Sequence, residues 1–314
     1  MKKYHLFHWL TAIMLIIFLA GCQSGQSSNE PKKEDTPEQV KAYTVKDDTG
    51  KEVSFKKAPE TVISLQPSNT EILFALGAGD KVIGATEYDN YPEQASKIER
   101  VSDSVTINTE KIIALKPDIV IAYTIGDENA LKPIEDAGIP VFVIQSASSF
   151  EDVYGDIQQI SEVMGVKEKG EELITNIRTH INDIENKLKN IEKPKRVYFE
   201  ISPSPDIYST GKNTFQQEIL QTAGVENIFG NQEGWIKVSE ETVIKLNPEI
   251  IATTVDYIEG PVAEIKARKG WETIEAIKKD IVYQLDSDIM SRPGPRIAEA
   301  VELVAKMAYP EYFK

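Results

Sequence analysis

A repeated segment constrains the fold of this chain more than any other feature. Residues 110–120 read EKIIALKPDIV, and residues 241–251 read ETVIKLNPEII. Each copy predicts a helix, a proline that stops it and a buried strand. A second match keeps the same order, because the tripeptide EIL begins six residues before Gly77 and again six residues before Gly224. Two matches in one order predict two similarly built lobes, and two copies are too few for a solenoid or propeller.

Short apolar runs alternate with amphipathic segments through the first half of the chain. Buried strands are expected at residues 62–65, 81–84, 119–122 and 141–144. Helices are expected between them at residues 70–76, 109–115 and 130–137. Strands and helices in alternation predict an α/β fold, with two doubly wound lobes whose sheets are mainly parallel.

One long amphipathic helix is expected to join the lobes. Residues 167–195 contain no glycine after Gly170 and no proline before Pro194, and apolar residues recur every three or four positions from Leu173 to Ile191. Such a helix spans roughly 30 Å or more and would limit motion between the lobes. The alternative is an ordinary long helix inside a single domain.

The first residues have the pattern of a secretory signal. Lys2 and Lys3 precede an apolar stretch, which ends at Leu19-Ala20-Gly21-Cys22, the only cysteine of the chain. This quartet resembles the bacterial lipobox, whose cysteine becomes the acylated (palmitate-bearing) first residue. We therefore expect a signal peptide over residues 1–21, and a lipidated Cys22 with a disordered polar tether over residues 22–42. The protein would then be anchored at the extracytoplasmic face of the cell membrane. The alternative is a lone buried cysteine.

Charge and residue usage exclude several functions. A formal net charge of −15 disfavours nucleic acid as a partner, because phosphate repels carboxylate. His180 is the only histidine outside the signal, and neither a G-x-S-x-G nor an H-E-x-x-H motif occurs. We therefore expect no enzyme activity, no resident cofactor and no metal site. An extracytoplasmic hydrolase with a hidden pair of carboxylates remains the alternative from another class.

The motifs together resemble a known family. Residues 62–77, VISLQPSNTEILFALG, are similar to the opening strand, turn and helix of the iron-siderophore and vitamin B12 substrate-binding proteins of ABC importers, and residues 115–121 are similar to the second strand. The resemblance implies a class III binding-protein fold, with an N-lobe over residues 43–162, a connecting helix over 163–194 and a C-lobe over 195–314. The ligand-binding domain would span about residues 61–314. It also implies a monomer that delivers its ligand to a permease dimer with a cytoplasmic ATPase.

Within that family, the chain is most similar to the vitamin B12-binding branch. Tyr88, Tyr123 and Trp235 stand where that branch places aromatic residues around the corrin, although Tyr123 replaces a tryptophan and Ser104 replaces another. Cobalamin is a broad, flat macrocycle of little net charge, and rings on loops after strands would suit it. The alternative is that each ring packs against its own lobe.

A segment near the C-terminus resembles the ligand-contact loop of the same branch. It consists of Asp288, Ile289, Met290, Ser291 and Arg292. Arg292, or Arg296 beyond it, would receive a phosphate or amide oxygen of the ligand. The alternative is a surface salt bridge between Asp288 and Arg292.

Glu110 and Glu241 begin the predicted helices of the two repeats. In the resembled family, one glutamate per lobe pairs with arginines of the permease, so both are expected to dock there. A glutamate in a first turn also complements the helix dipole, by about 0.3–1 kcal/mol. Glu71 and Glu218 form a second pair at comparable positions and are the fallback docking candidates.

The ligand is expected to be cobalamin or a related corrinoid. Ferric siderophores are the alternative, but catecholate complexes carry strong negative charge and require clustered arginine or lysine. Haem is a further alternative, in which Tyr88 or Tyr123 would have to supply the iron ligand.

Overall fold

The computed structural model describes residues 42–103, 106–123 and 130–314. Cys22, the expected signal, Ser104 and all but the last residue of the expected tether lie outside the described residues. The described chain falls in one compact unit that begins at Val40. None of its described helices is long and apolar enough to span a membrane.

The first sheet has five parallel strands in the order β5-β4-β3-β6-β7. These are β3 (Val62–Ser64), β4 (Val82–Thr86), β5 (Arg100–Ser102), β6 (Ile119–Tyr123) and β7 (Val141–Ile144). Val62 pairs with Val82 on one side and with Ile119 on the other. An antiparallel hairpin of β1 (Tyr43–Lys46) and β2 (Glu52–Phe55) precedes it, which the sequence reading did not predict.

A second, separate sheet follows in the chain. It consists of β8 (Arg196–Ser202), β9 (Tyr208–Thr210), β10 (Glu226–Asn227), β11 (Trp235–Lys237), β12 (Ile250–Thr253) and β13 (Val282–Gln284). β12 lies parallel to both β8 and β13, and β10 is parallel to β8, whereas β9 and β11 add an antiparallel edge. The prediction of two mainly parallel α/β sheets is therefore confirmed.

The first repeat seen in the sequence is also a repeat of structure. α2 (Thr109–Leu115) begins at Asn108, whose side chain accepts a hydrogen bond from the third helical N–H, and α7 (Glu240–Leu246) begins in the same way at Ser239. Both helices end at a residue in the left-handed conformation, Lys116 (φ 51°) and Asn247 (φ 46°), directly before the proline and the strand.

The second repeat is built equally closely. α1 (Pro67–Ala75) and α6 (Phe215–Thr222) are each followed by a glycine with positive φ, Gly77 (73°) and Gly224 (72°). The backbone N–H groups after both helices return to matching carbonyls: Ala78 donates to Leu73, and Val225 donates to Leu220.

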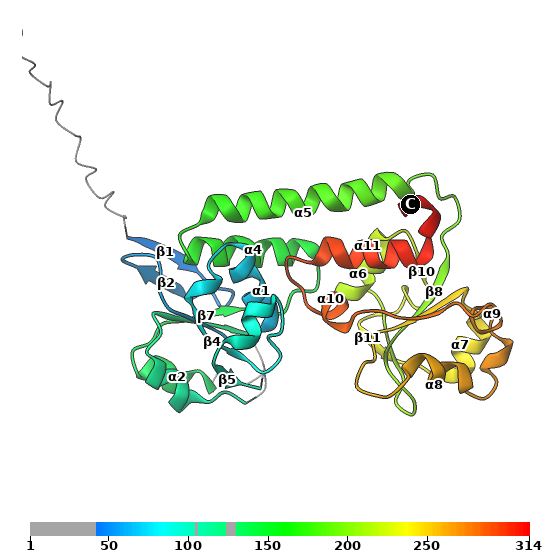
Figure 1. The fold of residues 1–314 in the computed structure, drawn as a ribbon, viewed down its shortest axis with the longest axis horizontal. Helices are drawn as coiled ribbons and strands as arrows, with labels where there is room; N and C mark the ends of the chain where they lie inside the picture. Colours follow the sequence, from blue (N-terminus) through cyan, green and yellow to red (C-terminus); the bar gives the residue numbers. More distant parts are fainter. Residues whose placement is uncertain (1–41, 104–105, 124–129) are drawn as a thin grey trace, which may run out of the picture. The chain divides into compact units, whose positions relative to one another are not determined.

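One layer of helices is shared by both sheets. It consists of α1, α4 (Phe150–Val163), α5 (Lys167–Leu188), α6 and α11 (Ile297–Ala308), and in Figure 1 α5 runs above α4 and α11. Buried apolar side chains of these helices and of both sheets belong to one continuous cluster. The opposite face of each sheet has a smaller cluster of its own, under α2 and α3 (Lys132–Asp136) in one lobe and under α7, α8 (Pro261–Ala267) and α9 (Glu275–Lys278) in the other. Because the largest core crosses the junction, the two lobes are packed together as well as tethered.

The long helix α5 is confirmed but is shorter than the predicted interval of 167–195. It ends at Leu188, and Ile191 lies in the turn that follows. Pro194 disfavours helical geometry at Lys193, so the helix cannot run to residue 195 as predicted. The remaining elements are α10 (Ser287–Ser291) and the 3₁₀ turns Gly79–Lys81, Glu93–Lys97, Trp271–Thr273 and Pro310–Phe313.

Candidate functional site

The expected aromatic residues stand at strand ends of both sheets. Tyr88 follows the carboxyl end of β4, Tyr123 is the last residue of β6, and Trp235 opens the edge strand β11. Tyr88 and Trp235 are 59% and 61% exposed, whereas Tyr123 is half-buried. The first two rings are therefore accessible from solvent.

Hydrogen bonds bring the Tyr88 loop against the 288–292 segment of the other lobe. The Asn90 side chain donates to Asp288 over 2.7 Å, and Arg292 donates to the carbonyl oxygen of Tyr88 over 2.9 Å. Asp89 fixes the loop from within, because its carboxylate accepts from both the N–H (2.8 Å) and the hydroxyl (2.5 Å) of Thr86. The structure thus unites Tyr88, Asp288 and Arg292, while Tyr123 and Trp235 are not part of this hydrogen-bonded group.

A buried ion-pair cluster lies directly beneath this loop. Glu71, on α1, is 2% exposed and accepts two hydrogen bonds from Arg296, at 2.8 and 2.6 Å, and one from Arg292 at 3.1 Å. Burial alone would lower the pKa of Arg296, but its hydrogen bonds and charge pairing with Glu71 raise that pKa overall. Arg292 also pairs with Asp288 at 2.6 Å, as the salt-bridge alternative predicted.

The fallback docking candidates, Glu71 and Glu218, both make hydrogen bonds within the chain. Glu71 is buried in this cluster, where no second protein can reach it. Glu218, on α6, is partly buried and accepts a hydrogen bond from the backbone N–H of Phe150 over 2.8 Å, and burial raises its pKa. Both glutamates accept hydrogen bonds from residues of the other lobe. The sequence alone did not show whether these side chains are buried or exposed.

Residues 288–292 do not all face outward. Met290 is fully buried in the large core, so its side chain does not reach a ligand, and Ile289 is partly buried against the same cluster. Ser291 is exposed. The expected ligand contacts of this segment are thus limited to Ser291, the accessible parts of Asp288 and Ile289, and the backbone.

Sequence reasoning missed three further groups. Tyr257 is 67% exposed on the loop after β12, and the carbonyl of Val255 in that loop accepts from Gln284. The buried side chain of Asn69 has no hydrogen-bond partner, and neither does Oε1 of Gln216. These two amides precede Glu71 and Glu218 by two residues, at equivalent places in the repeat, and such atoms usually bind ordered water or a ligand. Only the repeat register could have drawn attention to them.

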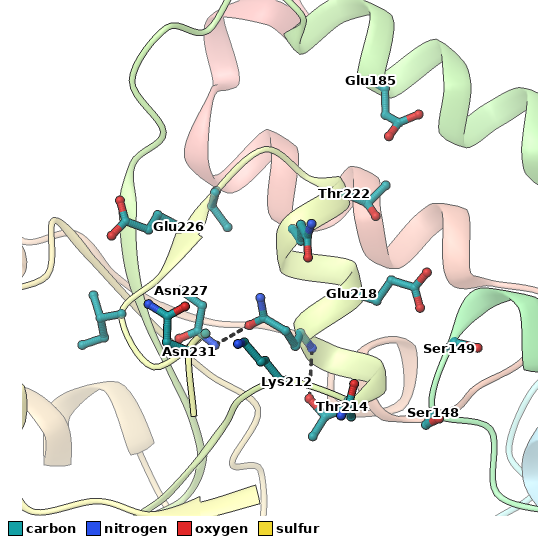
Figure 2. A pocket seen from close by; sticks show the side chains of 16 residues that line it. Ser148, Ser149, Glu185, Lys212, Thr214, Glu218, Thr222, Glu226, Asn227 and Asn231 are labelled. Atoms are coloured by element: carbon teal, nitrogen blue, oxygen red, sulfur yellow. Dashed lines mark hydrogen bonds between the residues drawn. The ribbon is translucent and has the colours of Figure 1, made fainter. Parts of the chain in front are cut away.

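Two pockets flank the packed junction. The larger, of about 810 Å³, is polar and is shown in Figure 2, where Glu218 extends from α6 and Ser148 and Ser149 come from the segment before α4. The other, of about 760 Å³, is lined by α1 and includes Glu71, Tyr91 and Arg296. Neither contains Tyr88, Tyr123 or Trp235, so neither is the site that those rings predict.

The predicted docking residues, Glu110 and Glu241, are both exposed in the first turns of α2 and α7. Neither makes an ion pair within the described chain. Glu240, by contrast, accepts a hydrogen bond from the indole nitrogen of Trp271 over 3.1 Å, so that carboxylate has a structural task. No cluster of metal-ligating side chains occurs among residues 42–103, 106–123 and 130–314.

Comparison with known proteins decides the family. A family model described as periplasmic binding protein matches residues 62–289. The chain belongs to the periplasmic binding protein family. The expected resemblance to substrate-binding proteins is thereby confirmed, and the chain is a solute-binding protein of this family, not an enzyme.

Individual relatives of this periplasmic binding protein are similar over most of its length. One, from Bacillus subtilis (strain 168), is described as an uncharacterized ABC transporter substrate-binding lipoprotein, with 40% identity over 98% of both chains. The vitamin B12-binding protein of Vibrio vulnificus (strain CMCP6) is 36% identical over 81% of this chain and 92% of its own. A solved structure of a possible iron-binding, periplasmic solute-binding protein from Staphylococcus epidermidis has a TM-score of 0.73 and 32% identity, covering 81% of this chain and all of the other.

Proposed function

We propose that this protein is a monomeric, lipid-anchored receptor that captures a corrinoid outside the cytoplasm and delivers it to an ABC permease. The observation that carries the proposal is the pair of open rings, Tyr88 and Trp235, at strand ends of two different sheets. Flat apolar faces of this kind suit a broad macrocycle edged with amides. The relatives described as a vitamin B12-binding protein and as a substrate-binding lipoprotein support the ligand and the anchor at Cys22.

Charge balance supports a corrinoid over a catecholate siderophore. Arg292 and Arg296 are the arginines that the sequence analysis expected to receive a ligand oxygen. Each is paired with an acid, since Glu71 and Asp288 match the two positive charges. The cluster carries no net charge, so it offers little to a strongly anionic complex. It is compatible with a ligand of little charge.

An iron-type ligand is the second candidate, because a similar solved structure is of a possible iron-binding protein. A hydroxamate siderophore is close to neutral, and a tyrosine such as Tyr123 can ligate haem iron. The ligand test must therefore include both.

Cyanocobalamin is expected to quench the fluorescence of Trp235 saturably in the mature protein. Trp9 leaves with the signal, and Trp271 is fully buried, so Trp235 is the exposed reporter. Titration with cyanocobalamin, a ferric hydroxamate and haem measures the effect, and the variant Trp235→Phe provides the matched control, in which most of the quenching should disappear. Saturable quenching by the siderophore or haem, without a response to cyanocobalamin, would replace the ligand.

Charge reversal at both Glu110 and Glu241 is expected to abolish corrinoid uptake and to leave ligand affinity unchanged. The two carboxylates occupy equivalent exposed helix starts, one per lobe, as a two-fold permease requires. Uptake by cells is compared with binding by the purified protein. Glu168, also exposed in the first turn of a helix but on α5, provides the control, and its reversal should leave uptake intact. Loss of binding in the Glu110→Lys, Glu241→Lys protein would contradict the docking role.

A further inference from the structure

The buried carboxylate of Glu71 needs an explanation beyond stability. Removing a carboxylate from water is costly, and an ion pair between well-hydrated surface residues would avoid that cost. Here, instead, Glu71 lies beneath the Tyr88 loop and is only 2% exposed. Its partners are two arginines, Arg292 and Arg296, which lie more than 200 residues later in the sequence. A network that costs desolvation, yet pairs both oxygens of Glu71 with arginine, indicates a specific geometric task.

Arg296 fixes Glu71 from one side. Its guanidinium forms a bidentate pair with both carboxylate oxygens and lies over the ring of Tyr91, 4.1 Å from the ring centre. Arg296 precedes α11, so this pair joins the start of α11 to α1. The backbone of Gly294 packs next to Ser68 at the start of α1, so the two elements are in direct contact beside the ion pair.

Arg292 connects Glu71 to the expected ligand contacts through hydrogen bonds. One terminal nitrogen donates to Glu71 (3.1 Å) and to the Asn90 side chain (2.8 Å), and the other donates to the Tyr88 carbonyl (2.9 Å) and to Asp288 (2.6 Å). With four acceptors from three segments, the terminal nitrogens have little capacity left for a ligand. Arg292 is better placed to hold the site together than to bind the ligand.

We propose that Glu71 is a positioning residue of the ligand site: through Arg292 and Arg296 it holds the loop that carries Tyr88 against α10 of the other lobe. The proposal rests on the proposed function, because it takes Tyr88 as a ligand contact. Without the carboxylate, the guanidinium groups of Arg292 and Arg296 would lose the negative charge that lies between them, and each would lose a hydrogen-bond acceptor. The Tyr88 loop and α10 would then separate more readily, and a ligand held between them would dissociate faster.

Glu71→Gln tests this directly, because glutamine keeps the shape but replaces one acceptor with an amide that faces arginine donors. Dissociation of cyanocobalamin, followed by stopped-flow fluorescence of Trp235, is expected to become about 10-fold faster or more, with the association rate little changed. In the ligand-free protein, amide hydrogen exchange in peptides covering residues 86–92 and 286–292 is expected to rise. Asn90→Ala, which removes only the exposed end of the network, should give the same pattern with a smaller change and keeps the test open if Glu71→Gln fails to fold.

Glu200→Gln is the matched control, since it breaks another buried glutamate–arginine pair, with Arg268, inside the second lobe. If it accelerates dissociation and exchange as much as Glu71→Gln does, or if Glu71→Gln leaves both at the wild-type level, the positioning role is wrong. If the wild-type protein does not bind cyanocobalamin at all, the proposed ligand is wrong, yet the exchange comparison still tests the role of Glu71. The two failures are therefore distinguishable.

Discussion

Replacing Arg268 by methionine is expected to lower the free energy of unfolding by about 3–5 kcal/mol. Arg268 donates to both carboxylate oxygens of Glu200, at 2.6 and 2.8 Å. Both side chains are almost fully buried in the second lobe. Methionine fills a similar volume but leaves Glu200 charged and unpaired. Burial already raises the pKa of Glu200 even beside the arginine, so its ionised form depends on this partner. Denaturant unfolding at pH 7 measures the loss.

The double variant Glu200→Gln, Arg268→Met tests whether the loss of stability comes from the unpaired charge of Glu200. It should recover a large part of the stability, because residue 200 then carries no buried charge. Glu264, the other carboxylate that pairs with Arg268, is only partly buried. The Tyr198 hydroxyl, which donates to Glu200 over 3.0 Å, can still donate to the glutamine oxygen. A loss below about 1 kcal/mol in Arg268→Met alone would show that the pair is solvated, against its observed burial.

Replacing Asp156 by asparagine is expected to stabilise the protein at pH 8 and to change little at pH 4. Asp156 is 7% exposed on α4, and burial, with the nearby charges of Asp48 and Asp152, raises its pKa to about 8. Its pKa in the unfolded chain is about 3.9. As the pH rises from about 4 to 8, the unfolded chain loses this proton while the folded chain keeps it, so the stability of the wild type falls across that range. Asparagine removes this cost, for a gain on the order of 2–4 kcal/mol at pH 7–8.

Thermal unfolding at pH 4, 6 and 8 measures the effect, and Asp152 on the same helix is the control of opposite sign. Its carboxylate accepts from the backbone N–H groups of Ser148 and Ser149 at the helix start. Burial alone would raise its pKa, but these hydrogen bonds lower it. Asp152→Asn should therefore destabilise at neutral pH and much less at low pH. An equal gain from Asp156→Asn at pH 4 and pH 8 would rule out titration as its cause.

The elements that sequence reasoning predicted well are those specified by local pattern. The strand at residues 119–122 and the helix at 109–115 are read from apolar runs and a proline stop, all close together in the sequence. The hairpin of β1 and β2 was missed, because its four-residue strands are too short to give a clear period. The end of α5 was missed because the apolar pattern continues through Ile191 after the helix has stopped.

The residues of the candidate site also differ in how far local sequence specifies their positions. That Tyr88 and Tyr123 follow strands was readable from the sequence, because a parallel sheet collects such ends at one edge. The environment of each glutamate was not, since Glu71 and Glu218 occupy equivalent places in one repeat, and Glu110 and Glu241 occupy equivalent places in the other. Only contacts with distant segments, such as that between Glu71 and Arg296, decide which of them are exposed.

The shared helical layer has a consequence for how such a duplicated chain can be divided. Either half expressed alone would expose apolar side chains to water along the seam where the lobes now pack. These side chains belong to α1 and α4 in one half, and to α6 and α11 in the other. A separated half should therefore aggregate in water or pair with a second copy of itself across that seam.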